Sequence, residues 1–314
     1  MKPSILFALA FGSVALLSCS KSDIEDEDWC IDPRYKVPLE VTVNLDDSFR
    51  DYCSVDTMYA TKSENDDSGV KPYLKYYVAA YPTNPSLPVV VASSVSKVVS
   101  VSIHPGKYKL VGWVDYEKFE SATNSRGLNF HTDDFSELLL KNKYTYTGAD
   151  RYKLGFRGAE DKNVAYNMSS TSVTVTPAMG YYRIVATDTA SFTPSKVVIK
   201  YSSLLPAAIN AKTGRINWWW DDISYSSPFK GDTLASDFVF SQPMETSVNV
   251  IVEIYDDCGN LRARKKDVRI PLVNGGVTTV KGNFFSVLES EPASSTGSGI
   301  TIKTEWDASF EIEL

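Results

Sequence analysis

The chain has 314 residues, of which 43% are hydrophobic and 23% charged, with a formal net charge of −7 and an isoelectric point near 5.1. This content is sufficient for a buried core, and the acidic balance argues against nucleic acid as a partner, because phosphates require a basic surface. Abundant tyrosine (18 residues), without long runs of strong helix formers, favours strands over helices.

The first residues of the chain have the pattern of a secretory signal. A short basic start and an apolar stretch over 5–17 predict a signal peptide at residues 1–18, which is too short to cross a bilayer as a permanent helix. Leu16-Leu17-Ser18-Cys19 resembles a lipobox, which implies that Cys19 is acylated, for example with palmitate. The alternative is an ordinary signal peptide with an incidental cysteine.

We expect residues 19–36 to form a lipidated, hydrated tether. They contain an acidic run at 25–28, which cannot contribute to a core and resembles the signal for export to the cell surface in Bacteroidales lipoproteins. The sequence therefore predicts a protein that is lipid-anchored in the outer membrane and exposed at the cell surface.

Three cysteines remain once Cys19 is lipidated, and this odd number excludes complete internal pairing. A disulfide between Cys30 and Cys53 is expected in an oxidising periplasm, because both flank the first predicted strand. Three free thiols, including that of Cys258, are the alternative.

Strand-like patterns fill most of the remaining chain. The segment Val37–Leu45 alternates between hydrophobic and polar residues, which is the period of a half-buried strand. Further strands are predicted at 70–81, 97–103, 107–116, 144–156 (two stretches), 171–187, 196–202, 236–240, 246–255, 261–271 and 277–287. Hairpin turns are predicted at 104–106 and 256–260, and 130–140 is the best helix candidate, with Asp133 as its cap.

A polar segment at 158–172 separates two blocks of strands. We therefore expect an N-terminal β-sandwich over 37–158 and a C-terminal β-sandwich over 159–314. The number of short strands with turn signals between them predicts an all-β fold of two tandem antiparallel β-sandwiches with Greek-key connections.

The last segment, 300–314, alternates without interruption. Its hydrophobic face includes Trp306, Phe310, Ile312 and Leu314, and such a face must be buried against something.

Four segments resemble the fimbrillin-like lipoproteins of Bacteroidales: 106–116 (GKYKLVGWVDY), 183–188 (RIVATD), 197–201 (VVIKY) and 277–285 (VTTVKGNFF). That group includes the anchor and accessory subunits of type V pili. The resemblance implies a fold of two transthyretin-like β-sandwiches. It also implies a structural, non-catalytic role at the cell surface, with pilin-like subunits as partners.

In pilus-building relatives a strand of one subunit completes the sheet of its neighbour, and 300–314 has the form of such a donor. The alternative is that it closes its own sheet. Polymerising stalk subunits also lose their lipidated segment at a basic residue. Arg34 and Arg50 could serve, but nothing marks either of them, so the sequence favours an anchor or accessory role in which Cys19 stays attached.

The sequence contains no assembled catalytic or metal motif. Only two histidines exist, His104 and His131, and the zinc-protease, nucleophile-elbow, paired Cys-x-x-Cys, phosphate-loop and dinucleotide motifs are absent. We therefore expect no enzyme, no cofactor and no metal site.

Trp218-Trp219-Trp220-Asp221-Asp222 is the one segment suited to a ligand, because aromatic rings stack on sugars and carboxylates accept hydrogen bonds from hydroxyls. Alternate side chains of a strand share a face, which would make Trp218 and Trp220 the stacking residues. The alternative function is therefore a surface glycan-binding lipoprotein of a polysaccharide-uptake system. A competing interpretation is that one or two of these tryptophans fill the core.

Five basic residues follow the predicted turn at 256–260: Arg262, Arg264, Lys265, Lys266 and Arg269. They either belong to a solvated hairpin or meet an anionic lipid or the acidic face of a partner.

Overall fold

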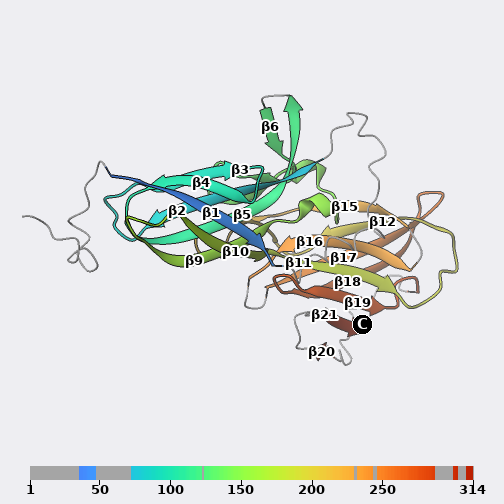
Figure 1. The fold of residues 1–314 in the computed structure, drawn as a ribbon. Helices are drawn as coiled ribbons and strands as arrows, with labels where there is room; N and C mark the ends of the chain where they lie inside the picture. The colour runs from blue at the N-terminus through green and yellow to red at the C-terminus, as the bar shows by residue number, and fades with distance from the viewer. Residues whose placement is uncertain are drawn as a thin grey trace, which may run out of the picture.

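The computed structural model describes residues 35–46, 72–121, 124–229, 232–242, 246–286, 300–302 and 309–313. Within these ranges the chain forms twenty-one strands in four sheets, two short 3₁₀ helices and no α-helix (Figure 1). The expected all-β fold class is confirmed. In the described part of the chain, no helix is long and apolar enough to cross a membrane.

The first sheet has eight strands and contains most of the first half of the chain. Its main path runs β3-β2-β5-β9-β10-β1-β4, with β6 attached to β5. These strands are β1 (Val37–Leu45), β2 (Tyr73–Pro82), β3 (Val90–Ser94), β4 (Val98–Ile103), β5 (Gly106–Ser121), β6 (Asn124–Gly127), β9 (Phe156–Val164) and β10 (Ser170–Pro177). Figure 1 shows the outer strands β3 and β4 side by side, so the sheet curves back on itself.

The curvature brings the middle of β5 close to β10 and β1. A Cβ atom on Gly112 would lie 2.8 Å from a methyl carbon of Val175 and 3.5 Å from one of Val43. Because Gly112 has no side chain, the fully buried valines opposite it can pack directly on the backbone of β5.

The second half of the chain forms a five-stranded sheet, β16-β11-β19-β21-β20, and a four-stranded sheet, β15-β12-β17-β18. The strands are β11 (Met179–Ala186), β12 (Pro194–Tyr201), β15 (Ser224–Pro228), β16 (Thr233–Phe240), β17 (Thr246–Asp256), β18 (Leu261–Leu272), β19 (Val277–Gly282), β20 (Ile300–Ile302) and β21 (Ser309–Glu313). The buried hydroxyls of Tyr182 on β11 and Tyr201 on β12 are 2.9 Å apart. The two sheets therefore face each other as layers.

Each half of the chain pairs its first strand in parallel with a late strand of the same half. β1 is parallel to β10, and β11 is parallel to β19. The chain passes from the first sheet to the second at Ala178, between β10 and β11. The expected boundary at 158/159 lies within β9, which pairs with β5 in the first sheet. The sequence of β9 is polar because one face of this strand is partly exposed. We propose that the two halves divide at Ala178.

A fourth sheet joins the two halves. Its order is β14-β13-β8-β7, with β7 (Phe130–His131) and β8 (Leu138–Leu140) from the first half and β13 (Leu205–Ile209) and β14 (Ile216–Trp220) from the second. The ring of Phe130 lies 5.2 Å from that of Trp113 and 5.6 Å from that of Phe240. One hydrophobic core therefore continues from the first half into the second.

A buried polar network also connects the halves. Lys153, in the 3₁₀ helix Arg151–Lys153, forms an ion pair of 2.6 Å with Asp237 on β16, and both side chains are almost fully buried. The carboxylate of Asp237 also accepts hydrogen bonds from the hydroxyls of Tyr146 and Tyr201, each at 2.7 Å. The two buried charges therefore compensate each other, as burial requires.

Most of the predicted strands are confirmed, as is the hairpin turn at 256–260 between β17 and β18. The predicted hairpin at 104–106 is wrong. β4 pairs with β1, whereas β5 pairs with β2 and β9. Pro105 and Gly106 reverse the chain locally, but turn residues do not decide which strand becomes the partner.

The predicted helix at 130–140 is also wrong, because this segment consists of β7, a turn and β8. The carboxylate of Asp134 accepts a hydrogen bond of 2.7 Å from the backbone N–H of Ser136, and such local bonds compete with helix formation. Two 3₁₀ helices, at Lys143–Thr145 and 151–153, replace the strands expected before β9.

The C-terminal segment differs from the single strand expected over 300–314. Its described parts, β20 and β21, run antiparallel to each other, and β21 lies parallel to β19 in the protein's own sheet. The alternation of hydrophobic residues indicates extended backbone, but it does not show whether that backbone forms one strand or two.

Candidate functional site

Several predicted site residues lie outside the described part of the chain: Cys19, Cys30, Cys53, Trp306 and Leu314. The acylation and the disulfide therefore stay predictions. Phe310 and Ile312 belong to β21, where they are in register with Thr278 and Val280 of β19. Donation of this segment to a partner also stays a prediction.

The three consecutive tryptophans do not alternate as expected. Trp218 and Trp219 are 52% and 45% exposed, whereas Trp220 is 7% exposed and packs edge-on against Tyr146 at 6.3 Å between ring centroids. The predicted pairing of Trp218 with Trp220 as stacking residues is therefore wrong. The pairing of β14 with β13 shifts register twice, and these irregularities break the alternation of side chains.

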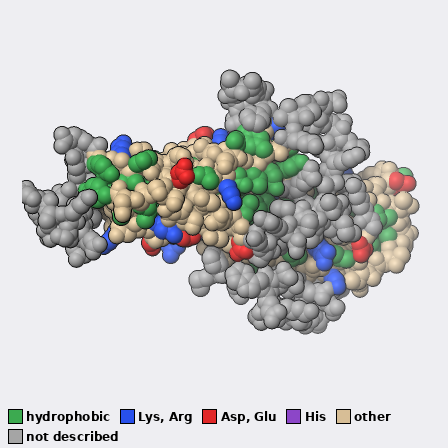
Figure 2. Space-filling model, viewed as in Figure 1, with side chains coloured by type: hydrophobic (Ala, Val, Ile, Leu, Met, Phe, Trp, Pro, Cys, Tyr) green, Lys and Arg blue, Asp and Glu red, His purple; other side chains and the backbone are tan. Residues whose placement is uncertain are grey.

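We call four exposed hydrophobic side chains near β14 the aromatic edge: Tyr144, Leu204, Trp218 and Trp219. Among the described residues β14 pairs only with β13, so it is an outer strand. Leu204 directly precedes β13, opposite the end of β14. Tyr144 follows Lys143, whose ammonium group is 2.6 Å from the carboxylate of Asp221. Figure 2 shows hydrophobic side chains gathered near the middle of one face, between the two halves of the molecule.

A second region, which we call the polar pocket, lies on β2 and β5. Alternate residues of the two strands pair on one face: Tyr73 with Glu117, Lys75 with Asp115 and Tyr77 with Trp113. Further along this face the sheet is covered by hydrophobic residues, and the ring of Tyr77 lies 5.9 Å from that of Phe135. Lys75, Asp115 and Glu117 therefore lie on the same face of the sheet as the hydrophobic core residues Tyr77 and Trp113.

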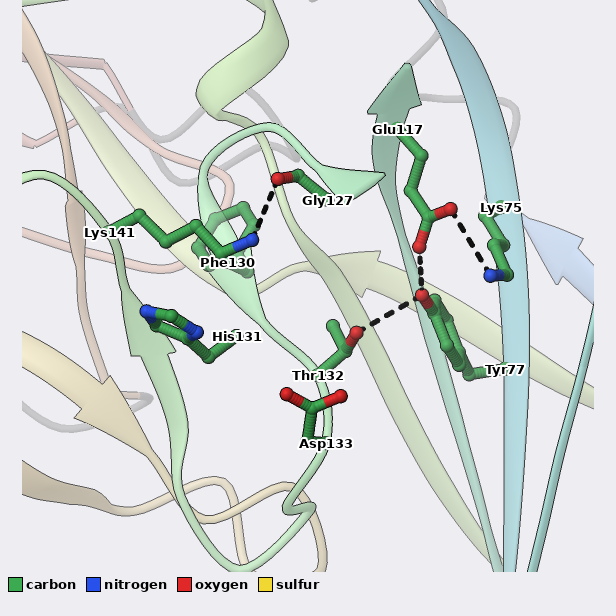
Figure 3. A pocket seen from close by; sticks show the side chains of 9 residues that line it. All are labelled: Lys75, Tyr77, Glu117, Gly127, Phe130, His131, Thr132, Asp133 and Lys141. Carbon is green, nitrogen blue, oxygen red and sulfur yellow. Dashed lines mark hydrogen bonds and ion pairs between the residues drawn. The ribbon is translucent and has the colours of Figure 1, made fainter. Parts of the chain in front are cut away.

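The pocket has a volume of about 350 Å³. Its walls come from β2, β5, β7 and the segments beside them (Figure 3). It is lined by Lys75, Tyr77, Glu117, Gly127, Phe130, His131, Thr132, Asp133 and Lys141. This volume lies at the lower end of the range for small-molecule sites.

Glu117 organises one wall of the pocket. It accepts hydrogen bonds from the hydroxyls of Tyr77 and Tyr73, the latter at 3.2 Å, and forms an ion pair of 3.1 Å with Lys75. The hydroxyl of Tyr77 in turn accepts a hydrogen bond of 3.1 Å from Thr132, as Figure 3 shows. Burial, together with the charges of Asp115 and Glu117, holds the pKa of Tyr77 far above its usual range, so this hydroxyl stays protonated.

Asp115 lies beside Glu117 on the same face of β5 and is completely buried. Burial, together with the charge of Glu117, raises the pKa of Asp115 to about 8. The indole N–H of Trp113, as a hydrogen-bond donor to this carboxyl group, and the charges of Lys141 and Lys75 oppose the rise. At neutral pH the group is therefore mostly protonated.

This pocket was not predicted from the sequence. The sequence does contain one indication of it. Val111, Trp113, Asp115 and Glu117 are alternate residues, so two acidic side chains lie on the hydrophobic face of a predicted strand. Of the two histidines, His131 lines the pocket. His104 is buried elsewhere, with Nδ1 2.7 Å from the backbone oxygen of Tyr35.

The basic residues of β18 are partly neutralised by ion pairs. Arg262 lies 3.4 Å from Asp256, and Arg264 lies 2.9 Å from Glu253. These pairs fit the interpretation of a solvated hairpin.

Only one group of side chains in the described ranges has the spacing of a metal site: Asp256, Asp257 and Cys258. Asp256 already accepts a hydrogen bond from the backbone N–H of Asn260 at 2.8 Å. The charges of Asp257 and Asp256 raise the pKa of the Cys258 thiol, which disfavours the thiolate that a metal would need.

The molecule is thus an all-β protein of stacked sheets, with an exposed aromatic edge and a partly buried polar pocket. Over residues 34–313 the chain matches the family described as "Family of unknown function (DUF6562)", and it belongs to that family. No curated protein matches it.

Several solved structures resemble the fold. A "putative adhesin" from Bacteroides ovatus is 10% identical and has a TM-score of 0.42, with 74% of this chain and 82% of that one covered. A "putative cell adhesion protein" from the same species is 14% identical, with a TM-score of 0.43 and coverage of 79% and 93%. A fimbrial assembly protein from Parabacteroides distasonis is 13% identical, with a TM-score of 0.34 and coverage of 85% and 94%.

Proposed function

We propose that this protein is a non-catalytic, surface-anchored lipoprotein that acts in fimbrial assembly or adhesion through protein contacts, as an anchor or accessory subunit of a type V-like pilus. The observation that carries the proposal is the aromatic edge. Trp218 and Trp219 expose about half of their surface on an outer strand, while the adjacent Trp220 is buried in the core.

Exposed tryptophan and tyrosine are the residue types that dominate binding energy at protein interfaces. An outer strand also presents backbone N–H and C=O groups with which an extended segment of a partner can pair. The aromatic edge combines both features, so a partner strand beside β14 would gain main-chain hydrogen bonds and aromatic contacts together.

The lipid anchor supplies the location in this proposal. Acylation of Cys19 would hold the chain in the outer membrane, and residues 19–36 would separate the anchor from the first strand, β1. Growth with labelled palmitate should give a labelled protein, and Cys19→Ala should remove the label. Protease treatment of intact cells should digest the body, whereas a fully protected body would place it inside the outer membrane.

Cross-linking on living cells followed by mass spectrometry tests the partner. Wild-type protein should be linked to pilin-like surface proteins through residues near β14, and the double variant Trp218→Ala/Trp219→Ala should lose most of these links. The double variant Val89→Ala/Val91→Ala, which removes similarly exposed side chains at another outer strand, β3, is the matched control and should keep them. Unchanged links in the tryptophan variant would contradict the proposal.

Glycan capture is the second candidate function. It is favoured by the two exposed indole rings next to the carboxylates of Asp221 and Asp222, with Trp219 in the role that the sequence assigned to Trp220. Isothermal titration against host and plant polysaccharides tests it. Heat beyond dilution, lost in Trp218→Ala/Trp219→Ala, would support this function, and no heat with the wild-type protein would remove it.

A further inference from the structure

We propose that β1, held between β10 and β4, is a mechanical clamp through which the protein carries tension from the chain before β1 to the second half of the molecule. The inference rests on the proposed function for the two points at which force acts, a lipid anchor before β1 and a partner beside β14. It adds a further function to that proposal, which is the bearing of load.

The first argument is the direction in which β1 runs. β10 ends at Pro177 and continues through Ala178 directly into β11, so the C-terminal end of β10 faces the second half. β1 is parallel to β10 and therefore also runs toward the second half, as Figure 1 shows. A pull on the chain before Val37, with the second half held, thus acts along the axis of β1.

The second argument is that β1 is held on both of its edges. Six residues of β1 are in register with β10, and six are in register with β4. A force along the strand axis loads all of these pairs at once, whereas a force that lifts one end of the strand loads them one after another. The hydrogen bonds on both edges must therefore yield together when the pull comes from the N-terminal side.

The third argument is the packing of β1 in the core. Val37, Leu39, Val41 and Val43 are each at most 2% exposed. Because side chains alternate between the faces of a strand, a slip by one residue would move this whole row out of the core. Close packing of the row therefore opposes sliding in addition to the hydrogen bonds.

The fourth argument is that the residue just before β1 is attached to the first half as well. The ring of Tyr35 lies 5.0 Å from that of Tyr166, and its hydroxyl donates a hydrogen bond of 3.1 Å to the backbone oxygen of Tyr166. Nδ1 of His104 lies 2.7 Å from the backbone oxygen of Tyr35. These contacts hold the chain at the point where tension enters β1.

The load also has a continuous path beyond the clamp. β10 passes tension through the backbone of Ala178 into β11, which lies between β16 and β19 in its own sheet. β11 is in register with both of these neighbours along most of its length. The strand that receives the load in the second half is therefore held on two edges, as β1 is in the first.

Stretching of single molecules of the mature chain with optical tweezers tests the clamp. One handle is attached at the N-terminus and the other at Cys258, an exposed thiol in the turn between β17 and β18. Cys30→Ser and Cys53→Ser leave Cys258 as the only thiol when the chain starts after Cys19.

The two handles load the molecule from opposite ends. The turn that contains Cys258 follows the end of β17 at Asp256, whereas Tyr201 of the buried network pairs with Val250 toward the other end of that strand. Extraction of β1 frees the chain up to the start of β2 and should lengthen the molecule by about 120 Å, since an extended residue spans roughly 3.3–3.6 Å. This length identifies the β1 step.

The critical comparison changes only the direction of the pull. In Asp46→Cys a handle on the residue after β1 replaces the N-terminal handle, so the force folds this end of β1 back along the strand and breaks its pairs in turn. The lengthening should then be about 90 Å, because the chain between this handle and β2 is shorter. We expect the force of the β1 step to be several times higher from the N-terminus than from position 46.

Val41→Ala and Val197→Ala are a matched pair of variants. Both side chains are completely buried, but Val41 is on β1 and Val197 is on β12. Urea unfolding should show similar losses of stability in the two variants. Forced unfolding depends on the rate at which the loaded element yields, so Val41→Ala should lower the force of the β1 step and Val197→Ala should leave it close to that of the wild type.

Two results would overturn the proposal. One is a β1 step that requires no more force from the N-terminus than from position 46. The other is an equal fall in this force in Val41→Ala and Val197→Ala. Neither result would contradict the proposed function, because palmitate labelling and cross-linking on cells do not depend on mechanical strength.

Discussion

The buried ion pair between Lys153 and Asp237 should be among the most sensitive points of the structure. Replacing Asp237 with alanine leaves the ammonium group of Lys153 buried without its counter-charge. It also removes the acceptor for the hydroxyls of Tyr146 and Tyr201. Breaking a buried pair in this way costs about 3–5 kcal/mol, which is a large part of the roughly 5–15 kcal/mol by which a typical domain is stable.

The matched control is an exposed pair in the same protein. Lys109 and Asp161 lie 3.0 Å apart on β5 and β9, with 37% and 80% of their side chains exposed. Asp161→Ala should lower the free energy of unfolding by only about 0–1 kcal/mol, because water screens the exposed charges. The double variant Lys153→Met/Asp237→Leu removes both buried charges and should therefore be more stable than Asp237→Ala alone.

Urea unfolding, followed by tryptophan fluorescence and circular dichroism, measures these differences. The pH dependence provides a further check. Burial lowers the pKa of Lys153, and Asp237 opposes this shift, so the pKa should fall further in Asp237→Ala. The unfolded chain then binds more protons than the folded one, and the stability deficit of the variant should shrink as the pH rises toward about 10. A loss in Asp237→Ala no larger than that in Asp161→Ala would refute the reasoning.

Three further changes have defined outcomes. Trp220→Ala should lower the free energy of unfolding by about 3–5 kcal/mol, because this ring is buried, whereas Trp219→Ala should leave the urea midpoint almost unchanged; equal effects would contradict the assignment of core and surface. Partial burial alone would raise the pKa of Asp188, but the three backbone N–H groups of 284–286 hydrogen bond to its carboxylate and hold the pKa below its usual value. The stability that this carboxylate contributes is therefore present above about pH 4 and is lost as the pH falls through the lowered pKa, and acid titration of Asp188→Asn should show a shallower loss than the wild type. Gly158→Ala should lower the stability by about 1–3 kcal/mol in thermal unfolding, because the new methyl group would collide with a backbone oxygen of β10; an unchanged melting temperature would show that β9 and β10 can separate at this point.

Local patterns in the sequence predicted many of the strands correctly. The alternation in Val37–Leu45 corresponds to β1, and the turn residues at 256–260 join two long strands that pair with each other. Side chains alternate between the two faces of any strand, whichever strand it pairs with. A strand can therefore be predicted from its alternating pattern without knowledge of its partner.

Local patterns gave wrong predictions where the outcome depends on which distant strand becomes the pairing partner. Turn residues at 104–106 predicted a hairpin, but β4 buries its alternate residues beside β1 instead of β5. Strict alternation along a strand predicts that Trp219 faces away from Trp218, yet the register shifts between β13 and β14 expose both side chains. In both cases the result depends on pairing between segments that are not adjacent in the chain.

The all-β character of this protein follows from the chain alone, because β-rich composition and a period of two are local properties. The complete burial of Asp115, the ion pair between Lys153 and Asp237, and the place of Trp220 in the core depend on packing between distant segments. Burial and partnership arise when the curved first sheet packs against the second half of the chain, and no local pattern specifies that contact.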